Sequence, residues 1–318
     1  MPPSLPLSSP DSPVLVIGSS GIDVIGRLEA DLNSGSSNSA RIRRSYGGVA
    51  RNISENLARL GQPVRLLTVA GNDPTGEDML EYTRAAGVDI SAVLRTGDFP
   101  TGYYMGVLNN RGLLEYAVDD MRLMSTLTGD TLRQHETLFK DAGMVVLDAN
   151  LPDAALRTAF SLARKARVPV CADPASVRLA HKLTRYIPRI FLTTPNSLEA
   201  GILTGKAFDP SDRKSALDAA RMLVSQGVSI VLITLAEFGV VYATSETSGH
   251  IPAIRTRIID PTGAGDALTA AVIFSLLNDI ELDDAIRLGV AAASLTLRHT
   301  GTVYPGLSLE KLYDQLPT

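Results

Sequence analysis

The stretch Met144–Ala172, MVVLDANLPDAALRTAFSLARKARVPVCA, contains two short apolar runs separated by an amphipathic segment. The runs are Met144–Leu147 and Val168–Ala172, and the segment between them is Ala154–Ala166. Near-continuous apolar strands of this kind are typical of a parallel sheet that is covered on both faces. The intervening segment is long enough for a crossover helix. This stretch therefore predicts a strand–helix–strand unit of an α/β protein.

The same alternation extends outward along the chain in both directions, and from about residue 267 onward the pattern becomes mainly helical. We therefore expect an α/β protein, a doubly wound layer sandwich with a mainly parallel sheet. The further predicted strands are Val14–Ile17, Val64–Val69, Ile190–Thr193 and Ile230–Thr234, and the further predicted helices are Ser215–Ser225, Ala267–Leu277, Asp283–Leu297 and Ser308–Gln315.

Two segments interrupt this rhythm. Ile22–Tyr46 contains the polar loop Asn33–Ala40, and Thr101–Val118 alternates apolar and polar residues around the turn Asn109–Gly112, which is a hairpin signal. If the two segments pair, they form a small β-sheet that could cover a site as a lid, but periodicity alone does not show the pairing. Residues 1–13 are rich in Pro and Ser and are expected to form a disordered tail, which leaves residues 14–318 for the folded domain.

Charge and hydropathy exclude two classes of partner. The 318 residues carry 30 Lys and Arg against 34 Asp and Glu, which gives a net charge of −4 and a pI of about 5.6. No dense basic block is present to neutralise a phosphate backbone, so no nucleic-acid partner is expected. The sequence also lacks the ~18 to 20 consecutive apolar residues of a membrane span. We therefore expect no membrane partner.

Cysteine and histidine usage exclude a disulfide framework and a conventional zinc site. Cys171 is the single cysteine, so no intramolecular disulfide forms, and a reducing, cytoplasmic location is expected. The four histidines are scattered without the spacing of metal ligands, and we interpret them as surface or structural residues.

A glycine-rich loop precedes the predicted helix Ala267–Leu277. The loop, Asp260–Asp266, reads DPTGAGD. Glycines before a helix let backbone N–H groups converge on an anion, and the helix dipole strengthens that attraction. Asp266 at the edge of such a cradle could accept a proton from a hydroxyl while the loop stabilises a transferring phosphoryl group. The alternative is an ordinary glycine-rich helix start in which Asp266 only complements the dipole.

A second glycine pair opens the segment Gly47–Gly61, GGVARNISENLARLG. Its apolar residues recur at i, i+4 and i+7, which predicts a helix with one face against the sheet. Gly47 and Gly48 would allow the backbone to approach a ligand closely, and Asn52 in the first turn could hold hydroxyl groups. A glycine turn followed by a packing helix with a solvated Asn52 explains the pattern equally well.

Polar residues follow several of the predicted strands, at the edge where open α/β sheets bind ligands. Asp23 suits a bidentate grip on vicinal hydroxyls, although a solvated turn Asp is the alternative. Asn196 and Glu199 form a pattern typical of a capping box, and Glu199 could also hold hydrated Mg²⁺ near phosphates. Further polar side chains that end strands and could face the same crevice are Asp148, Asn150 and Asp173.

Taken together, Gly47–Gly61 and the longer stretch Asp260–Val272, DPTGAGDALTAAV, resemble the two signatures of the ribokinase-like (PfkB) family of small-molecule kinases. The resemblance extends from about Val14 to Leu316. It implies a three-layer α/β/α sandwich with a β-sheet lid. It also implies ATP as phosphate donor, Mg²⁺, and phosphorylation of a primary hydroxyl on a sugar or nucleoside.

The resemblance also implies roles for individual residues. Asp266 is similar to the family's catalytic base, and Asn196 and Glu199 are similar to its Asn-x-x-Glu element at the Mg²⁺-phosphate end. Thr234–Gly239 is similar to its nucleotide-binding turn, except that Ala236 stands where a glycine is usual. The remaining residues that this likeness assigns are Gly263, Ala264 and Gly265 to the anion hole, Asp23, Gly47, Gly48 and Asn52 to the sugar-hydroxyl grip, Thr234 and Gly239 to ATP, and Asp260 and Thr262 to a monovalent cation such as K⁺.

Within the family, five short motifs are most similar to those of pseudouridine kinases, and Arg51 before Asn52 is part of that likeness. The implied substrate is pseudouridine, with Arg51, Asp148 and Asn150 in its site. Ribose, a ketose and another nucleoside stay open as substrates, as does a sensor without catalysis, and the lid could serve as a homodimer interface. The five motifs are IDVIG (22–26), GGVARN (47–52), AVDDM (117–121), VVLDAN (145–150) and CADPAS (171–176).

Overall fold

The computed structural model describes residues 11–206, 208–209 and 212–316. Residues 1–10 of the predicted tail lie outside the described residues. Its last residues are held by hydrogen bonds: the Gln62 side-chain amide donates to the Ser12 carbonyl at 3.1 Å, and the Gly143 amide donates to the Pro13 carbonyl at 2.9 Å. The folded part therefore begins slightly before Val14.

The predicted α/β sandwich is confirmed. A central sheet of eight strands has the order β14-β13-β12-β11-β10-β9-β1-β4. The strands from β12 to β4 are parallel, whereas β13 and β14 form an antiparallel edge that the sequence pattern did not predict. In chain order the strands are β1 (Val14–Ile17), β4 (Val64–Leu67), β9 (Met144–Asp148), β10 (Val170–Asp173), β11 (Leu192–Thr193), β12 (Ile230–Thr234), β13 (Val240–Ala243) and β14 (Ser248–Ile251).

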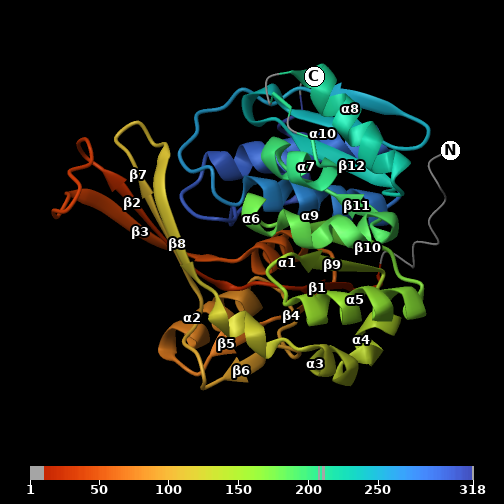
Figure 1. Ribbon diagram of the computed structural model, residues 1–318, viewed down its shortest axis with the longest axis horizontal. Coiled ribbons are helices and arrows are strands. Elements are labelled where there is room, and N and C mark those ends of the chain that lie inside the picture. The colour runs from red at the N-terminus through yellow and green to blue at the C-terminus, as the bar shows by residue number, and fades with distance from the viewer. Residues whose placement is uncertain (1–10, 207, 210–211, 317–318) are drawn as a thin grey trace.

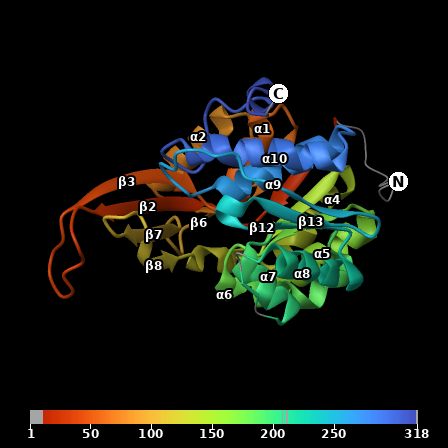
Figure 2. The same cartoon turned by 90° about the horizontal axis from the view of Figure 1, so that it is seen from above.

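Helices cover both faces of this sheet, as Figure 2 shows. Because the strands alternate their apolar side chains between the two faces, each helix layer encloses its own cluster of buried residues. One layer contains α1 (Val49–Arg59), α9 (Ala264–Leu277), α10 (Leu282–Leu297) and α11 (Leu309–Tyr313). The other contains α3 (Gly129–Gln134), α4 (Glu136–Asp141), α5 (Asp153–Ala166), α6 (Val177–Ala180), α7 (Ser197–Thr204), α8 (Arg213–Ser225) and the 3₁₀ helices η1 (Arg122–Thr126) and η2 (His181–Arg189), with η3 (Ala236–Phe238) between β12 and β13.

A second sheet, here called the projecting sheet, extends from the body at the left of Figure 1. Its four strands have the order β3-β2-β7-β8. The two interrupting segments of the sequence supply one hairpin each, and the parallel pairing of β2 with β7 joins them. The pairing that periodicity left open is therefore present. The strands are β2 (Gly21–Leu28), β3 (Ala40–Gly47), β7 (Tyr103–Leu108) and β8 (Leu114–Asp120).

A small unit lies below the base of the projecting sheet in Figure 1. It contains α2 (Pro74–Ala85) and the two-stranded sheet of β5 (Val69–Gly71) and β6 (Leu94–Thr96). The predicted single strand Val64–Val69 is wrong at its end, because Thr68 separates β4 from β5. The Thr68 hydroxyl donates to the Gly18 carbonyl at 2.6 Å, which ties this break to the end of β1.

Helix α1 is amphipathic, as its sequence pattern predicted. Ile53 and Leu57 are fully buried against the sheet and α9. Gly61 follows the helix with φ 90°, in the left-handed region that glycine adopts without steric cost. This packing fixes the first turn of α1, and with it Asn52, relative to the carboxyl end of the sheet.

Candidate active site

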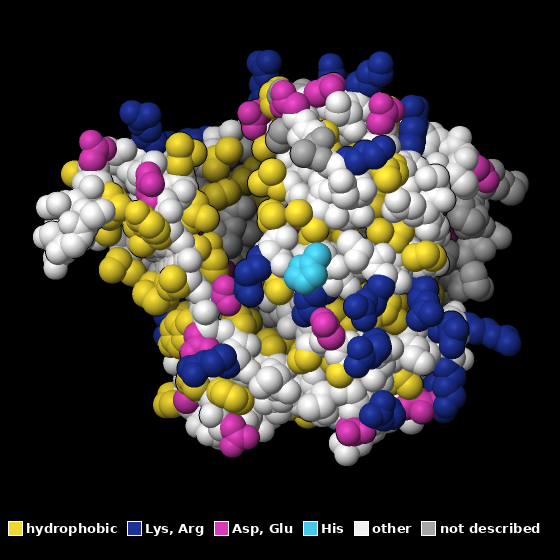
Figure 3. All heavy atoms as spheres, viewed as in Figure 1, with side chains coloured by type: hydrophobic (Ala, Val, Ile, Leu, Met, Phe, Trp, Pro, Cys, Tyr) yellow, Lys and Arg dark blue, Asp and Glu magenta, His cyan; other side chains and the backbone are white. Residues whose placement is uncertain are grey.

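A pocket of about 420 Å³ lies between the projecting sheet and the carboxyl ends of the central strands. Figure 3 shows this side of the molecule hollowed beside the projecting sheet, along which hydrophobic side chains gather. The predicted residues in the pocket wall are Asp23, Gly48, Asn52, Asn150, Thr262 and Asp266, and other residues of the wall are Ser19, Ile25, Tyr104, Leu108, Leu114, Asp119, Met121 and Arg178. The structure therefore places Asp23, Gly48, Asn52 and Asp266 in the wall of one cavity, whereas Gly47 is not among its lining residues.

The N-terminus of α9 opens beside this pocket. The helix begins at Ala264, three residues earlier than predicted, and Gly263 precedes it with φ 80° and no side-chain cap. A Cβ on Gly263 would lie 1.9 Å from the Thr302 carbonyl oxygen, so only glycine fits there, whereas a Cβ on Gly265 would meet nothing within 4 Å. The first N–H groups of a helix have no partner within it. Among the residues predicted as an anion cradle, Gly265 therefore has open space beside it, whereas Gly263 is packed closely against Thr302.

Asp266 lies in the first turn of α9 and is held by Asn52. The Asn52 side-chain amide donates to the Asp266 carboxylate at 2.7 Å. Burial raises the pKa of Asp266 to about 7, the Asn52 hydrogen bond opposes that shift, and the negative charge of Asp23 adds to it. A carboxyl group with a pKa near neutrality is suited to exchange a proton with a substrate hydroxyl.

Asp23 on β2 faces the pocket and is 8% exposed. Burial raises its pKa to about 6, while the nearby Arg51 charge lowers it. Gly47 makes room for this carboxylate, because a Cβ at that position would lie 2.3 Å from an Asp23 oxygen. Gly48 has φ 92°, and a Cβ there would lie 2.5 Å from the Ser20 Cα and 2.6 Å from the Ser19 carbonyl oxygen. The glycine pair is therefore needed to pack α1 beside Asp23.

Arg51 differs from its predicted place in the substrate site. Its side chain is fully buried under α1 and forms an ion pair with Glu55, which also binds Arg59. Its guanidinium donates to the carbonyls of Gly47 at 3.1 Å and Tyr46 at 2.9 Å. Arg51 does not line the pocket. It fixes the backbone of the glycine pair and, through its charge, lowers the pKa of Asp23.

Asp148, which was predicted to bind substrate, lies beneath the pocket and is not among the residues that line it. It is 1% exposed, and one carboxylate oxygen accepts from the Ser19 amide at 2.7 Å, the Ser19 hydroxyl at 2.8 Å and the Ala50 amide at 3.3 Å. The Asn150 side chain lines the pocket and donates to the Ser19 hydroxyl at 3.1 Å. Asp148 thus joins the ends of β9 and β1 to the start of α1.

Asn196 and Glu199 form the capping box of α7 that the sequence pattern offered as an alternative. The Asn196 side chain accepts from the Glu199 amide at 3.0 Å, and the Glu199 carboxylate accepts from the Asn196 amide at 2.9 Å. Burial raises the pKa of Glu199. Asn196 also bridges to Thr234 at the end of β12. These residues gather at the same sheet edge but do not line the pocket that holds Asp266.

The carboxylates at this edge interact with one another. Burial, followed by the charges of Asp266 and Glu199, raises the pKa of Asp173 well above its usual range. Asp173 is the last residue of β10 and accepts from the Ala175 amide at 2.7 Å. Deprotonation of Asp173 is therefore unfavourable beside these carboxylates, and a nearby cation would favour it.

Ala236 stands in the turn after β12 with φ 49°, in the left-handed region that costs a side chain roughly 1 to 2 kcal/mol. The turn is closed by the Gly239 amide, which donates to the Ala236 carbonyl at 3.2 Å. A Cβ on Gly239 would lie 2.2 Å from the Ile251 carbonyl oxygen. The turn thus retains the conformation that glycine favours, although alanine stands where the resembled family has glycine.

Asp260, predicted beside a monovalent cation, contacts a cationic side chain of the protein instead. The Arg43 guanidinium on β3 lies 2.6 Å from one carboxylate oxygen, and the other oxygen accepts from the Thr262 amide at 3.0 Å. Asp260 is 1% exposed. The charge that an added cation would balance is therefore already balanced, and the residues present do not fit a K⁺ ion in contact with Asp260.

Several residues of the site escaped the sequence interpretation. Ser19 lies two residues after β1, where the sequence shows only a small polar residue after a strand. Tyr104 lies on β7, and the periodicity of the sequence did not show which strand β7 pairs with. Arg43 belongs to the cluster RIRR (41–44), whose alternation on β3 is the one signal that places it on the same sheet face as Asp23.

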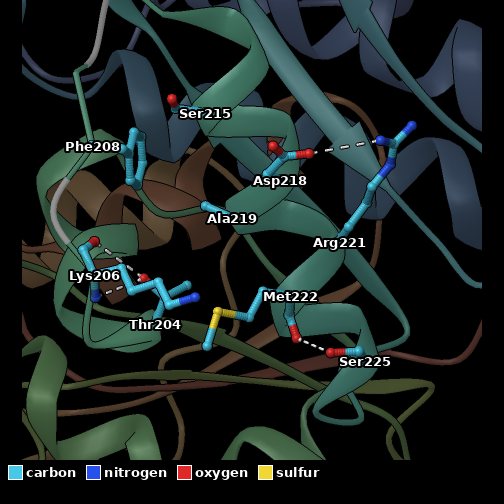
Figure 4. A pocket seen from close by; sticks show the side chains of 9 residues that line it. All are labelled: Thr204, Lys206, Phe208, Ser215, Asp218, Ala219, Arg221, Met222 and Ser225. Atoms are coloured by element: carbon cyan, nitrogen blue, oxygen red, sulfur yellow. Dashed lines mark hydrogen bonds and ion pairs between the residues drawn. The ribbon is translucent and has the colours of Figure 1, made fainter.

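A second hollow, of about 480 Å³, lies between α7 and α8 (Figure 4). Thr204, Lys206 and Met222 are among its lining residues, and Asp218 lies 3.8 Å from Arg221. None of the predicted catalytic or binding residues lines it. We therefore place the candidate active site in the pocket with Asp266.

Two findings concern classes of site beyond this pocket. Across residues 11–206, 208–209 and 212–316, no helix is both long enough and apolar enough to cross a bilayer. The same part of the chain contains no group of three or more His, Cys, Asp or Glu side chains arranged to hold a metal ion. Cys171 is buried and free.

Comparison with known proteins agrees with this geometry. Pseudouridine kinase of Escherichia coli (strain K12) is 33% identical over 297 residues, which cover 93% of this chain and 94% of that protein. Ribokinase of Staphylococcus aureus (strain COL) is 29% identical over 293 residues, which cover 91% of this chain and 94% of that protein.

A solved structure has the same fold along almost the whole chain. Arabidopsis thaliana ribokinase, complexed with ribose and ATP, superposes with a TM-score of 0.84 at 23% identity and covers 97% of this chain and 99% of that chain. Residues 11–308 match the pfkB family of carbohydrate kinases, which are phosphotransferases acting on hydroxyl groups of sugars or nucleosides. The chain belongs to this family.

Proposed function

We propose that this protein transfers the γ-phosphate of ATP to the primary hydroxyl of a sugar or nucleoside bound beneath the projecting sheet. The observation that carries the proposal is the Asp266 carboxylate, which lies in the first turn of α9 and accepts a hydrogen bond from Asn52. A sensor without catalysis would need the amides of the loop but not this carboxylate, whose burial raises its pKa to about 7.

The proposed reaction begins with positioning. Asp23 and Asn52 bind the secondary hydroxyls of the sugar, so that the primary hydroxyl lies beside Asp266. Asp266 takes the proton of that hydroxyl as its oxygen forms a bond to the γ-phosphorus, and the bond between the γ-phosphorus and the bridging oxygen of ADP breaks. The amides of Gly263, Ala264 and Gly265 stabilise the negative charge spread over the transferring oxygens.

The nucleotide and Mg²⁺ bind at the adjoining edge of the central sheet in this proposal. Glu199 would hold Mg²⁺ through water, and the ion would neutralise part of the phosphate charge of ATP. The proximity of the Asp173 carboxyl group to those of Glu199 and Asp266 supports a cation near this edge. Thr234 and Gly239 bound the turn where the nucleotide contacts the protein.

The projecting sheet serves as a lid over the sugar. Its inner face contributes Asp23, Tyr104 and Asp119 to the pocket wall, with apolar side chains between them. Closure of such a cover excludes water, which would otherwise attack ATP. The same apolar wall suits a flat base attached to the sugar, which supports a nucleoside over free ribose.

Within this reaction class we favour pseudouridine as the acceptor, giving pseudouridine 5′-phosphate. The identity of 33% to the Escherichia coli pseudouridine kinase supports that substrate. The ribokinase of Staphylococcus aureus is 29% identical, which keeps free ribose as the second candidate. A ketose and an ordinary nucleoside are the remaining acceptors of the same chemistry.

The outer face of the projecting sheet supports a homodimer. Ile42, Met105, Tyr116 and Val118 lie on that face and are between 50% and 73% exposed. A contiguous exposed patch of apolar side chains marks an interface more often than free surface. We infer that two copies of the chain pair through these faces in the cytoplasm.

Replacing Asp266 with Asn should remove the proton acceptor and keep the shape of the site. We expect kcat to fall by about 10² to 10⁴-fold while the Kd of the sugar or nucleoside stays nearly unchanged. Steady-state kinetics and calorimetric titration measure the two quantities. Asp218→Asn, in the hollow between α7 and α8, is the matched control and should retain wild-type rates; an Asp266→Asn enzyme of normal kcat would contradict the role of base.

The acceptor is identified by ATP-dependent phosphorylation of pseudouridine, uridine, adenosine, ribose and fructose, with ADP release as the readout. We expect the highest kcat/KM for pseudouridine. Preference for ribose or fructose would keep the mechanism and discard the nucleoside. Binding of these compounds with no turnover of any of them would support the sensor and contradict the kinase.

The acid limb of the pH profile should report Asp266, because only its deprotonated form accepts a proton. We expect kcat/KM to fall as the pH drops below about 7, in line with the raised pKa of Asp266. Asn52→Ala removes a hydrogen bond to the charged form, so the limb should move to higher pH. Asp23→Asn removes a negative charge near Asp266, so the acid limb should move to lower pH. Equal or reversed movements would show that another group controls the limb.

The dimer is tested by light scattering coupled to gel filtration. The wild-type chain should have twice the mass of one chain, and Met105→Glu with Val118→Glu should reduce it to one, because two carboxylates would be desolvated at the interface. Glu115→Gln, at the register shift of the same strand, is the control. A wild-type monomer over the whole accessible concentration range would contradict this interface.

A further inference from the structure

Arg43 of the projecting sheet reaches the loop that leads into α9. It lies on β3 opposite Ile25 and on the sheet face that carries Asp23. Its guanidinium contacts the Asp260 carboxylate at 2.6 Å, and its side chain is 28% exposed against 1% for Asp260. This ion pair therefore joins two segments that are far apart in the chain. One lies beside the proposed sugar site, and the other lies beside Gly263–Gly265, here called the anion loop.

The Asp260 carboxylate is surrounded by N–H groups that donate to it or pair with its charge. One carboxylate oxygen accepts from the Thr262 amide at 3.0 Å, and the other accepts from the Gly301 amide at 3.2 Å in addition to its contact with Arg43. A buried carboxylate holds such groups in fixed positions because leaving its charge unpaired is costly. Thr262 directly precedes Gly263, so the position of Asp260 determines where the anion loop begins.

The groups around the Asp260 carboxylate favour an N–H donor, rather than a metal cation, as its partner. A monovalent cation is bound by oxygen acceptors, whereas the groups that touch this carboxylate are N–H donors. The Nε atom of Arg43 is also buried without a hydrogen-bond partner among the residues that the structure describes. An unpaired donor of the guanidinium therefore lies beside Asp260, and the positive charge of that guanidinium would repel a second cation.

We infer that the Arg43 guanidinium takes the place of a monovalent cation in this enzyme, so that organisation of the anion loop does not depend on K⁺. Arg43 is a positioning residue, because it acts on the loop through Asp260 and does not touch the reacting atoms. A dissociable ion is not attached to the projecting sheet, whereas Arg43 is part of β3. The position of the loop before α9 therefore depends on the position of β3, and the projecting sheet is linked to the proposed phosphate site. The inference rests on the proposed kinase reaction only for its kinetic readout.

The first experiment compares the wild-type chain in potassium chloride and in tetramethylammonium chloride at equal ionic strength. We expect the same Tm and the same kcat/KM for ATP in both salts. The Tm readout needs no turnover, so it tests the inference even if the proposed reaction is absent. A saturable rise of the wild-type Tm or rate with K⁺, absent with tetramethylammonium, would overturn the inference.

The second experiment replaces the guanidinium. Arg43→Met should lower kcat/KM for ATP by roughly 10- to 100-fold, the scale of a misplaced catalytic group, and should make Tm and rate rise with added K⁺. Arg41→Met, which removes a cation from the same face of the same strand but from an exposed pair with Glu29, should do neither.

A third variant covers the case in which Arg43→Met does not fold. Arg43→Lys keeps a positive charge within reach of Asp260, so it should fold, retain more activity than Arg43→Met and stay insensitive to K⁺. If Arg43→Lys becomes K⁺-dependent, or if Arg43→Met behaves like Arg41→Met, the guanidinium does not have the inferred role.

Discussion

The buried carboxylate of Asp148 is the interaction on which the active site depends. It accepts hydrogen bonds from Ser19 at the end of β1 and from Ala50 in the first turn of α1. The same first turn of α1 contains Asn52, whose side-chain amide donates to Asp266 at the start of α9. Three elements that meet at the carboxyl edge of the sheet are thus aligned through one side chain that does not reach the pocket, so an error in its position would propagate to the reacting groups.

Negative charge is concentrated around this alignment. Asp23, Asp173 and Asp266 all have raised pKa values, for which burial is the leading cause and mutual repulsion a further one. A protein that binds a polyanion such as ATP gains little from several carboxylates unless each has a separate task. Two positive charges nearby, Arg51 and Arg43, are themselves held in ion pairs with Glu55 and Asp260, so they shape the backbone rather than meet the phosphates.

The sequence predicted the elements that local periodicity controls and missed those set by long-range contact. The strand–helix–strand unit, the amphipathic α1 and the glycine start of α9 all follow from residues close together in the chain. The antiparallel edge of β13 and β14 and the break at Thr68 do not, because each depends on a partner from a distant segment. The same limit applies to the site: Asp266 and Asn52 were predicted, whereas the burial of Arg51 and Asp148 beneath the pocket depends on packing that a motif does not describe.

The parallel pairing of β2 with β7 has a consequence for how the chain folds. Each hairpin of the projecting sheet can form from neighbouring residues, but the seam between them must wait until α1, β4 and α2 have brought the hairpins together. Closing that long loop costs entropy before any seam contact repays it. The cover of the active site is therefore expected to assemble late, after the sheet that it covers, and its inner apolar side chains stay in water until then.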